Sequence, residues 1–414
     1  MGSSEKAPHF MPQLRAVLAF AHPTLGVVAG DRAPAAALST KRTGPTYSAR
    51  QWLVKVGGAF SLRRQTENIN ESRNLRQNVG GKPLSMAEGD PVVVLCPGQG
   101  AQTVGQGRAW YDTSSAARGL IQRADRYLGR SRLPNGQSLI DIMFNGPKHV
   151  LDRTDVAQPA IFVTSLACWA GLEQFELAPG MRSPPSYTAA TAGLSLGEYT
   201  ALVLAGALDF EAALELVTIR GDAMQQAADS TEGTMVALLG ASEEQMLQIC
   251  EACRKRGEVL VPANFNAPGQ VVLSGSKEAC QRAMAYATDK LHLKATELSV
   301  AGAFHSPLMQ PAADRLADAL QSTEINVPLK YSVMCNVTGR AHENDKDAIR
   351  QRLIEQLTAP VRWQACIQNA VIDHGDRTCF LELAPGRTLA GLLKRIDRKR
   401  AITNHDAPAA QAAS

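Results

Sequence analysis

Apolar runs and helix-like stretches alternate over most of the chain. The run VVVLC at 92–96 is continuously apolar, as in a strand buried on both faces, and a glycine-rich turn follows it. Further strand patterns occur at 186–192 and 378–385, and helical spacing occurs at 158–175, 196–208 and 386–396. This alternation predicts a mostly parallel sheet with helices on both of its faces.

The segment 231–300 has a different order of elements. Strands are predicted at 234–240, 259–265, 270–275 and 294–300, and helices at 243–256 and 277–290. Ser242 and Ser276 stand where each helix would need an N-cap. The order is βαββαβ, which is typical of a ferredoxin-like unit inserted into a larger domain.

These patterns divide the chain into five parts. The large domain is expected at 91–230 and 301–400, with the small unit 231–300 between its halves. Residues 1–90 are expected to be an N-terminal extension, and 401–414 a disordered tail.

Composition and charge narrow the class of protein. The 414 residues are 45% hydrophobic and 20% charged, which is ordinary for a soluble globular protein. The net charge is +4, but residues 1–90 have 12 Lys and Arg against 6 Asp and Glu, and the remainder has 31 against 33. The folded part therefore shows no nucleic-acid footprint. It has no apolar run of membrane-spanning length, so we expect no membrane partner.

The N-terminal extension has three interpretations. It is basic and poor in acids, as in an organelle transit peptide. It is also compatible with a disordered extension, or with a working protein that starts near Met86. A cytoplasmic location is expected, with the mitochondrial matrix or plastid stroma as the alternative if the extension is a transit peptide.

Eight cysteines are spread through the predicted strands and helices, which indicates reduced thiols. Cys250 and Cys253 are the only close pair, and no second pair lies at the spacing of a zinc site. We therefore expect no metal site.

A nucleophile elbow is predicted at Gly193-Leu194-Ser195-Leu196-Gly197, between a short strand and a helix. Glycines on both sides let the chain turn sharply and expose the serine hydroxyl at the helix N-terminus. The next N–H can then point at an oxyanion. The alternative is a serine that only caps the helix.

A base must activate this serine, because a free hydroxyl is a weak nucleophile. His305 is the first candidate, ahead of His374 and His342, but a lone histidine also serves for capping or packing. The loop 97–107, PGQGAQTVGQG, lacks the lysine of a P-loop and the last glycine of a dinucleotide motif. It is compatible with a turn that brings a backbone N–H to the site.

Several motifs follow one another in a specific order between residues 91 and 400. They are PGQGAQ (97–102), QPA (158–160), GLSLGEYTAL (193–202), IRGDAMQ (219–225), NFNAPGQVVLSG (264–275), GAFHSPLM (302–309), QLTAPVRW (356–363) and LAPGRTLAGLLKRI (383–396). Together they resemble the malonyl-CoA:acyl-carrier-protein transacylases of type II fatty-acid synthesis. One departure is Leu194, where that family usually has histidine. The resemblance implies an α/β fold, with an α/β-hydrolase-like large domain around a parallel sheet and an inserted ferredoxin-like small domain.

The resemblance also implies the catalytic roles. Ser195 would be the nucleophile and His305 its base, without a third carboxylate. The backbone carbonyl of Gln356 would orient the His305 ring, and the N–H groups of Gln99 and Leu196 would form the oxyanion hole.

The same resemblance implies the substrate contacts. Arg220 would face the substrate carboxylate, since a guanidinium binds both carboxylate oxygens at once; without the resemblance it would be a surface helix arginine. Gln158, Asn264 and Asn266 would shape the pocket or hydrogen-bond within it, and Phe304 would exclude an α-methyl branch.

The implied activity is ping-pong transfer of a malonyl group from malonyl-CoA to the phosphopantetheine thiol of holo-acyl carrier protein, for fatty-acid elongation. No cofactor is expected, and the chain is expected to act as a monomer. A candidate docking surface for an acidic carrier protein, or simply a solvated helix end, is formed by Lys394, Arg395, Arg398, Lys399 and Arg400.

Three alternatives stay open. A serine esterase or thioesterase shares the elbow but would want an acid between serine and histidine along the chain. A discrete acyltransferase of a polyketide pathway would use the same chemistry with another partner. An inactive carrier-protein docking module is disfavoured by the intact set of Ser195, His305 and Arg220.

Overall fold

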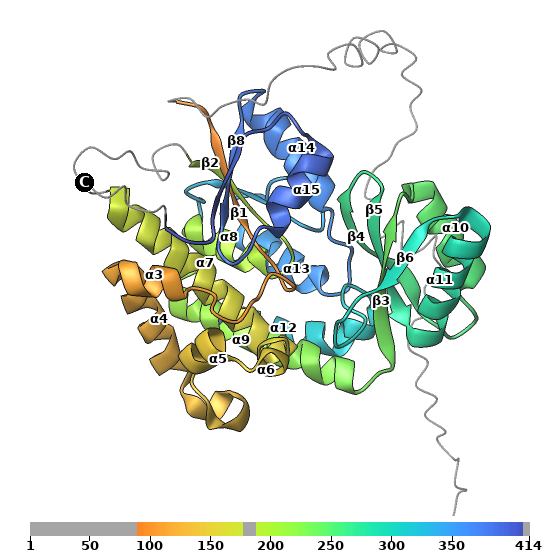
Figure 1. Cartoon of the computed structure of the whole chain (residues 1–414), viewed down its shortest axis with the longest axis horizontal. Coiled ribbons are helices and arrows are strands. Elements are labelled where there is room, and N and C mark those ends of the chain that lie inside the picture. The colour runs from red at the N-terminus through yellow and green to blue at the C-terminus, as the bar shows by residue number, and fades with distance from the viewer. Residues whose placement is uncertain (1–88, 177–187, 409–414) are drawn as a thin grey trace, which may run out of the picture. The chain divides into compact units, whose positions relative to one another are not determined.

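Five parallel strands form the first of two sheets, in the order β7–β2–β1–β8–β9, of which β2, β1 and β8 are labelled in Figure 1. The computed structural model describes residues 89–176 and 188–408, which belong to one compact unit of the chain. The strands are β1 (Val92–Cys96), β2 (Thr188–Gly193), β7 (Ser332–Met334), β8 (Cys379–Leu383) and β9 (Ile402–His405). The parallel sheet predicted from the alternation of elements is confirmed.

Helices cover both faces of this sheet because β1 is apolar on both sides. Val92, Val94 and Cys96 belong to one buried cluster, and Val93 and Leu95 belong to the other. The first cluster is built with α3 (Arg108–Thr113), α4 (Ser115–Leu128), α5 (Leu139–Asn145), α6 (Lys148–Leu151), α7 (Thr154–Glu176), α8 (Gly197–Leu204), α9 (Phe210–Asp229), α12 (Gln310–Gln321) and α13 (Lys346–Gln356). The second is built with α14 (Trp363–His374) and α15 (Thr388–Ile396). Short 3-10 turns are η1 (Arg130–Arg132), η2 (Pro134–Gly136) and η4 (Pro307–Met309).

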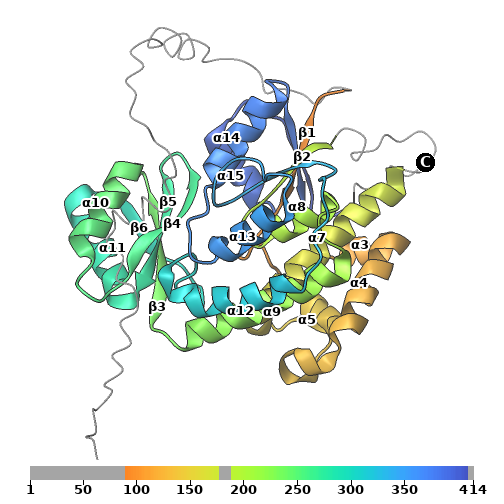
Figure 2. The ribbon, with the colours of Figure 1, turned by 180° about the vertical axis from the view of Figure 1, so that it is seen from behind.

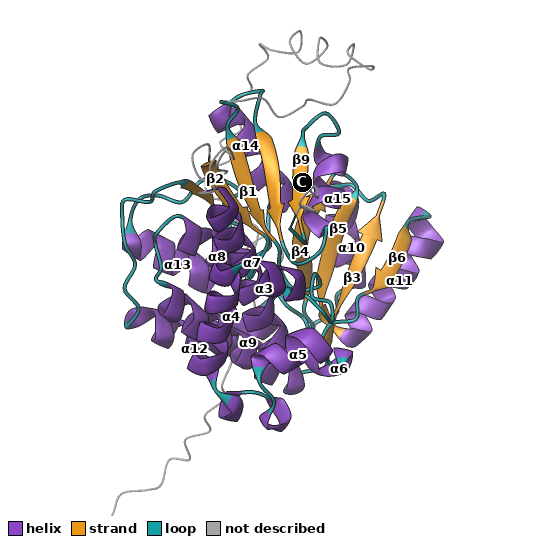
Figure 3. Cartoon of the chain, turned by 60° about the vertical axis from the view of Figure 1, so that its left-hand side comes forward, coloured by secondary structure: helices purple, strands orange, loops and turns teal. Residues whose placement is uncertain are grey.

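The second sheet is antiparallel, in the order β4–β5–β3–β6, and lies beside the first (Figure 3). Its elements along the chain are β3 (Gly233–Leu239), α10 (Glu243–Cys253), β4 (Leu260–Ala267), β5 (Gln270–Ser276), α11 (Lys277–Leu291) and β6 (Lys294–Glu297). Both helices cover the face turned away from the parallel sheet (Figure 1 and Figure 2). This is the predicted βαββαβ unit with a core of its own.

The two predicted caps of this unit behave differently. Ser242 forms a capping box with Gln245, each side chain bonding to the other residue's backbone. Ser276 stands at the N-cap of α11 without a capping bond, and its hydroxyl instead accepts from the backbone N–H of Val259 at 3.1 Å. The prediction for Ser276 was wrong because its oxygen instead accepts from Val259, the residue before β4.

The predicted tail from residue 401 is also corrected. Ile402–His405 forms β9, which pairs in parallel with β8. The carbonyl of His405 accepts from the indole N–H of the buried Trp110 at 3.0 Å. Hydrogen bonds of the backbone and of the Trp110 indole hold this segment. Its sequence therefore lacks the apolar pattern from which a strand is predicted. The predicted N-terminal extension as far as residue 88 and the tail from 409 lie outside the described residues.

Helix α7 is the one helix in the described part of the chain that is long and apolar enough to cross a membrane. Its apolar window is 89% buried inside the protein, and it packs between α4 and α9. It is placed as a core helix.

The small sheet is held against the carboxyl ends of the parallel strands. Val361, between α13 and α14, accepts from the N–H of Phe265 at 2.9 Å and donates to Ala263 at 2.8 Å. This pairing brings β4 next to the end of α13, which itself contacts the turn after β2. The crevice beyond the carboxyl ends of parallel strands is where open α/β sheets bind ligands.

Candidate active site

Ser195 occupies a tight turn between β2 and α8. Its φ of 53° lies in the left-handed region, which a residue other than glycine rarely adopts. A Cβ on Gly193 would lie 1.8 Å from the carbonyl carbon of Gly197, and a Cβ on Gly197 would lie 2.1 Å from the oxygen of Cys96. Only glycine fits at these two positions, so the motif has the geometry of a nucleophile elbow.

His305 reaches the same serine from the loop that follows β6. Its Nε2 lies 2.9 Å from Ser195 Oγ, and its Nδ1 lies 2.9 Å from the backbone oxygen of Gln356. A carbonyl oxygen only accepts, so Nδ1 carries the proton and Nε2 keeps the lone pair that accepts from the serine hydroxyl. His305 also has a positive φ, 56°, so the fold holds both residues in a strained backbone conformation.

The His305 ring is neutral at pH 7. It is 4% exposed, and this burial, with a smaller effect from the charge of Arg220, lowers its pKa to about 4. A neutral imidazole with a free Nε2 lone pair can take a proton from the serine hydroxyl.

Arg220 lies on α9 and is 1% exposed, so the interpretation as a surface arginine is excluded. Its Nη1 donates to Gln158 Oε1 at 2.7 Å, and its Nη2 donates to Ser195 Oγ at 3.0 Å and to Gln356 Oε1 at 2.9 Å. Burial lowers the pKa of this guanidinium, but arginine remains protonated at pH 7. The nucleophile therefore lies beside a buried positive charge.

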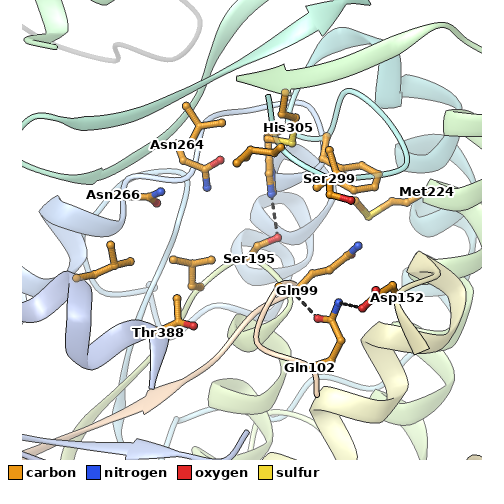
Figure 4. Close-up of a pocket in the computed structure, with 18 of the residues that line it drawn as sticks. Gln99, Gln102, Asp152, Ser195, Met224, Asn264, Asn266, Ser299, His305 and Thr388 are labelled. Atoms are coloured by element: carbon orange, nitrogen blue, oxygen red, sulfur yellow. Dashed lines mark hydrogen bonds between the residues drawn. The ribbon is translucent and has the colours of Figure 1, made fainter. Parts of the chain in front are cut away.

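A pocket of about 230 Å³ opens onto Ser195 between the two sheets (Figure 4). Seven of the predicted site residues line it, namely Gln99, Ser195, Arg220, Asn264, Asn266, Phe304 and His305. The remaining walls that sequence reasoning missed are mainly apolar, from Met224, Met235, Val272, Leu298, Val300 and Leu392. These residues come from ordinary buried or half-buried positions of helices, strands and one loop, which carry no local signal of a pocket.

Among the residues that line the pocket, Gln99 has its side chain turned to Thr154, with Nε2 3.3 Å from the threonine hydroxyl. Three further predicted residues, Leu196, Gln158 and Gln356, do not line the pocket. Leu196 directly precedes α8, and its side chain is buried in the core. Gln158 is fully buried and contacts Arg220, while Gln356 contacts His305 through its backbone and Arg220 through its side chain.

A buried polar network under the elbow was not assigned from the sequence. Asn336 accepts from the Ser195 N–H at 2.6 Å and donates to the Gly193 carbonyl at 2.7 Å. Glu198 Oε1 lies 2.6 Å from His342 Nε2, and its Oε2 accepts from Gln356 Nε2 at 2.6 Å and from the Asn336 N–H at 3.2 Å. The one available signal was an acid, Glu198, inside an otherwise apolar helix.

His342, which the sequence analysis considered only as a base, is paired with this acid instead. Burial alone would lower the pKa of His342, but the side chains of Cys335 and Glu198 outweigh that effect and raise it to about 10. Within the described residues, Glu198, Cys335 and His342 are the one group of potential metal ligands. Glu198 and His342 already neutralise each other by a direct hydrogen bond, which accounts for the cluster without an ion.

A serine in an elbow, beside a neutral histidine, is the machinery of covalent acyl transfer. The sequence model of the family described as acyl transferase domain matches residues 93–409. The chain belongs to the acyl transferase family, in its branch of malonyl CoA-acyl carrier protein transacylases.

Relatives from a bacterium and from human are both named as malonyl-CoA–acyl carrier protein transacylases. The malonyl CoA-acyl carrier protein transacylase of Bacillus subtilis is 36% identical over 311 residues, which span 74% of this chain and 91% of the relative. The mitochondrial transacylase of Homo sapiens is 36% identical over 313 residues, 73% of this chain and 76% of the relative. A solved structure of a malonyl-transacylase in complex with its type II PKS acyl-carrier protein has a TM-score of 0.69 and 33% identity, covering 77% of this chain and 96% of that one.

Proposed function

We propose that this acyltransferase moves a malonyl group from malonyl-CoA to the phosphopantetheine thiol of holo-acyl carrier protein, for fatty-acid elongation. The observation that carries this proposal is Arg220, a buried cation 3.0 Å from Ser195 Oγ in the wall of the pocket. A buried charge is costly unless it is paired, so the pocket favours an acyl group that ends in a carboxylate. The names of the relatives support the same substrate.

In the first half-reaction, Ser195 Oγ attacks the thioester carbonyl carbon while its proton moves to Nε2 of His305. The Gln356 carbonyl keeps Nδ1–H in place, so the ring needs no carboxylate to orient it. The N–H groups of Gln99 and Leu196 stabilise the oxyanion. The C–S bond then breaks, the proton passes from Nε2 to the CoA sulfur, and a malonyl ester remains on Ser195.

In the second half-reaction, the phosphopantetheine thiol enters the same site. His305 takes the thiol proton as the sulfur attacks the ester carbonyl. When the intermediate collapses, the proton returns to Ser195 Oγ and the malonyl group leaves as a thioester of the carrier protein.

The surroundings of Arg220 suit a two-point contact with a carboxylate. A guanidinium has five N–H donors, and Gln158 and Gln356 each take one, on Nη1 and Nη2. The second hydrogen of Nη1, together with the Nη2 hydrogen that faces Ser195 in the free protein, can hold both carboxylate oxygens. Asn264, Asn266 and Phe304 line the pocket. In this proposal the two asparagines border the acyl chain, and Phe304 excludes an α-methyl branch.

The remaining parts of the proposal concern cofactors, assembly and location. The chemistry above uses no cofactor, and one chain supplies every residue of the site, so a monomer suffices. All eight cysteines are free and buried, which suits a reducing compartment. The human relative is named as mitochondrial, and a fluorescent fusion of residues 1–90 distinguishes cytoplasm from organelle import.

The proposal is tested by comparing malonyl-CoA with acetyl-CoA as donors to holo-acyl carrier protein. Replacing Arg220 with alanine is expected to lower the malonyl preference ~100-fold, since two charge-assisted bonds are lost. Arg315→Ala is the matched control, because Arg315 is an exposed arginine on α12 paired with Asp222. An unchanged preference in Arg220→Ala would refute carboxylate recognition by this residue. Discharge of the enzyme by water but not by the carrier thiol would favour a thioesterase.

A further inference from the structure

The side-chain amide of Gln356 has different partners at its two ends. Its Nε2 donates to Glu198 Oε2 at 2.6 Å and to the backbone oxygen of Ser195 at 3.0 Å, while its Oε1 accepts from Arg220 Nη2 at 2.9 Å. An amide that turns over exchanges its donor and its acceptor. The orientation of Gln356 therefore decides whether the Arg220 guanidinium meets an oxygen or an N–H group.

Two acceptors favour the observed orientation, the backbone oxygen of Ser195 and the Glu198 carboxylate, and Glu198 makes the shorter bond. A carboxylate only accepts hydrogen bonds, so the amide must present its NH₂ group to Glu198 and its oxygen to Arg220. The other oxygen of Glu198 is occupied by His342, whose Nε2 lies 2.6 Å away. Glu198 is 0%, Gln356 1% and His342 8% exposed, so solvent offers no competing partner.

We propose that the Glu198–His342 ion pair is a positioning device for substrate selection, which locks Gln356 so that its oxygen holds Arg220 toward the acyl pocket. The inference rests on the proposed function, because it takes Arg220 to recognise the substrate carboxylate. It assigns a positioning role to two residues that do not line the pocket.

The fixed orientation of Gln356 affects carboxylated acyl groups more than neutral ones. With the amide turned over, its NH₂ group would face the N–H groups of Arg220, and the guanidinium would be displaced. His305 would stay in place, because the backbone oxygen of Gln356 holds it and does not turn with the side chain. A carboxylated acyl group would therefore lose its contact while a neutral one would still react.

The first variant is Glu198→Met with His342→Leu, which removes both charges and leaves no unpaired buried ion. Transfer to holo-acyl carrier protein is measured with malonyl-CoA and acetyl-CoA. The malonyl kcat/KM is expected to fall about tenfold, mainly through KM, and the acetyl value to stay within about twofold. Thr200→Val is the matched control, since Thr200 is buried on the same helix without a hydrogen-bond partner for its hydroxyl.

Glu198→Gln is the second variant, in case the double replacement does not fold. An amide at 198 can satisfy Gln356 in either orientation, so a smaller loss of malonyl preference, about threefold, is expected. In an Arg220→Ala background, neither the double replacement nor Glu198→Gln is expected to reduce malonyl transfer further, because the orientation of Gln356 acts through Arg220. Equal losses for both donors, or losses that add to that of Arg220→Ala, would overturn the inference and leave the pair a support of the elbow.

The failure of the proposed function is recognised separately, as a wild-type protein that transfers no malonyl group. The positioning is then measured without turnover by ¹⁵N NMR of the full chain. The Arg220 Nε–H resonance is expected to shift in Glu198→Gln and not in Thr200→Val. An Arg220 resonance that is unchanged in Glu198→Gln would overturn the inference.

Discussion

Replacing Asn336 with aspartate changes one of the two hydrogen-bonding groups that this side chain presents to the turn at Ser195. Asn336 is fully buried, accepts from the Ser195 N–H at 2.6 Å and donates to the Gly193 carbonyl at 2.7 Å. Aspartate keeps the shape and the acceptor, but it replaces the donor with an oxygen that faces the Gly193 carbonyl. The Ser195 N–H would remain bonded while the Gly193 carbonyl would lose its partner.

The expected cost follows from these two contacts. Losing one buried hydrogen bond costs about 1 kcal/mol, and leaving a buried carbonyl without a partner costs about 1–3 kcal/mol more. We expect the free energy of unfolding to fall by about 3 kcal/mol at pH 7.5. This equals a folded-state pKa for the introduced carboxyl about 2 units above the ordinary 3.9, since each unit is about 1.4 kcal/mol.

The sign of the pH dependence follows from that raised pKa. A carboxyl that binds its proton more tightly in the folded state destabilises the protein at high pH, and the deficit shrinks as pH falls through the folded-state pKa of about 6. The protonated carboxyl then donates to the Gly193 carbonyl, as the amide did. Urea unfolding of wild type and variant at pH 7.5 and 5.0 measures this, with an expected deficit of about 1.5 kcal/mol at pH 5.0. Equal deficits at both pH values, or none at pH 7.5, would refute this account of the elbow.

Three further predictions concern other parts of the structure. The single-turnover rate of Ser195 acylation, measured after a pH jump, should stay flat from pH 8 to about 5.5 and fall with a midpoint near 4. The reason is that burial and Arg220 lower the pKa of His305 to about 4. A midpoint near 6.5 would contradict the buried neutral base. The raised pKa of His342, about 10, gives stability that is fully present below about pH 6.5 and is lost as pH rises through 10. In urea unfolding, the free energy of unfolding of wild type should therefore exceed that of Glu198→Met with His342→Leu by less at pH 9 than at pH 6. A difference that stays constant with pH would contradict the ion pair. Deleting residues 401–414 removes β9 and the acceptor of the Trp110 indole, so the Tm should drop by several degrees and tryptophan emission should shift to the red; unchanged emission would show that β9 does not hold Trp110.

The elbow could be predicted from sequence because its requirements are local. A strand, two glycines around Ser195 and a helix all fall within about twenty residues, and each has its own pattern. The same holds for the βαββαβ unit, where turn residues and caps separate clear strands and helices. Local patterns sufficed wherever the structure depends on neighbours in the chain.

The rest of the site depends on residues that are distant in sequence. His305 lies 110 residues from Ser195, so spacing alone left His374 and His342 as alternatives, and the resemblance to a family made the choice. The Glu198–His342 pair spans 144 residues and has no periodic signal. β9 was missed because ITNH has one apolar residue, Ile402, which packs against the core. Backbone pairing with β8 and the side chain of Asn404 hold the rest of the strand.

Intact mass spectrometry detects a malonyl ester on Ser195 and its discharge by the carrier thiol. The protein is mixed with malonyl-CoA, weighed, digested to locate the adduct, and then given holo-acyl carrier protein. We expect one malonyl group on the peptide that holds Ser195, absent in Ser195→Ala, and its transfer to the carrier protein. A malonyl adduct that persists in Ser195→Ala, or carrier protein that becomes malonylated without any enzyme adduct, would contradict this expectation.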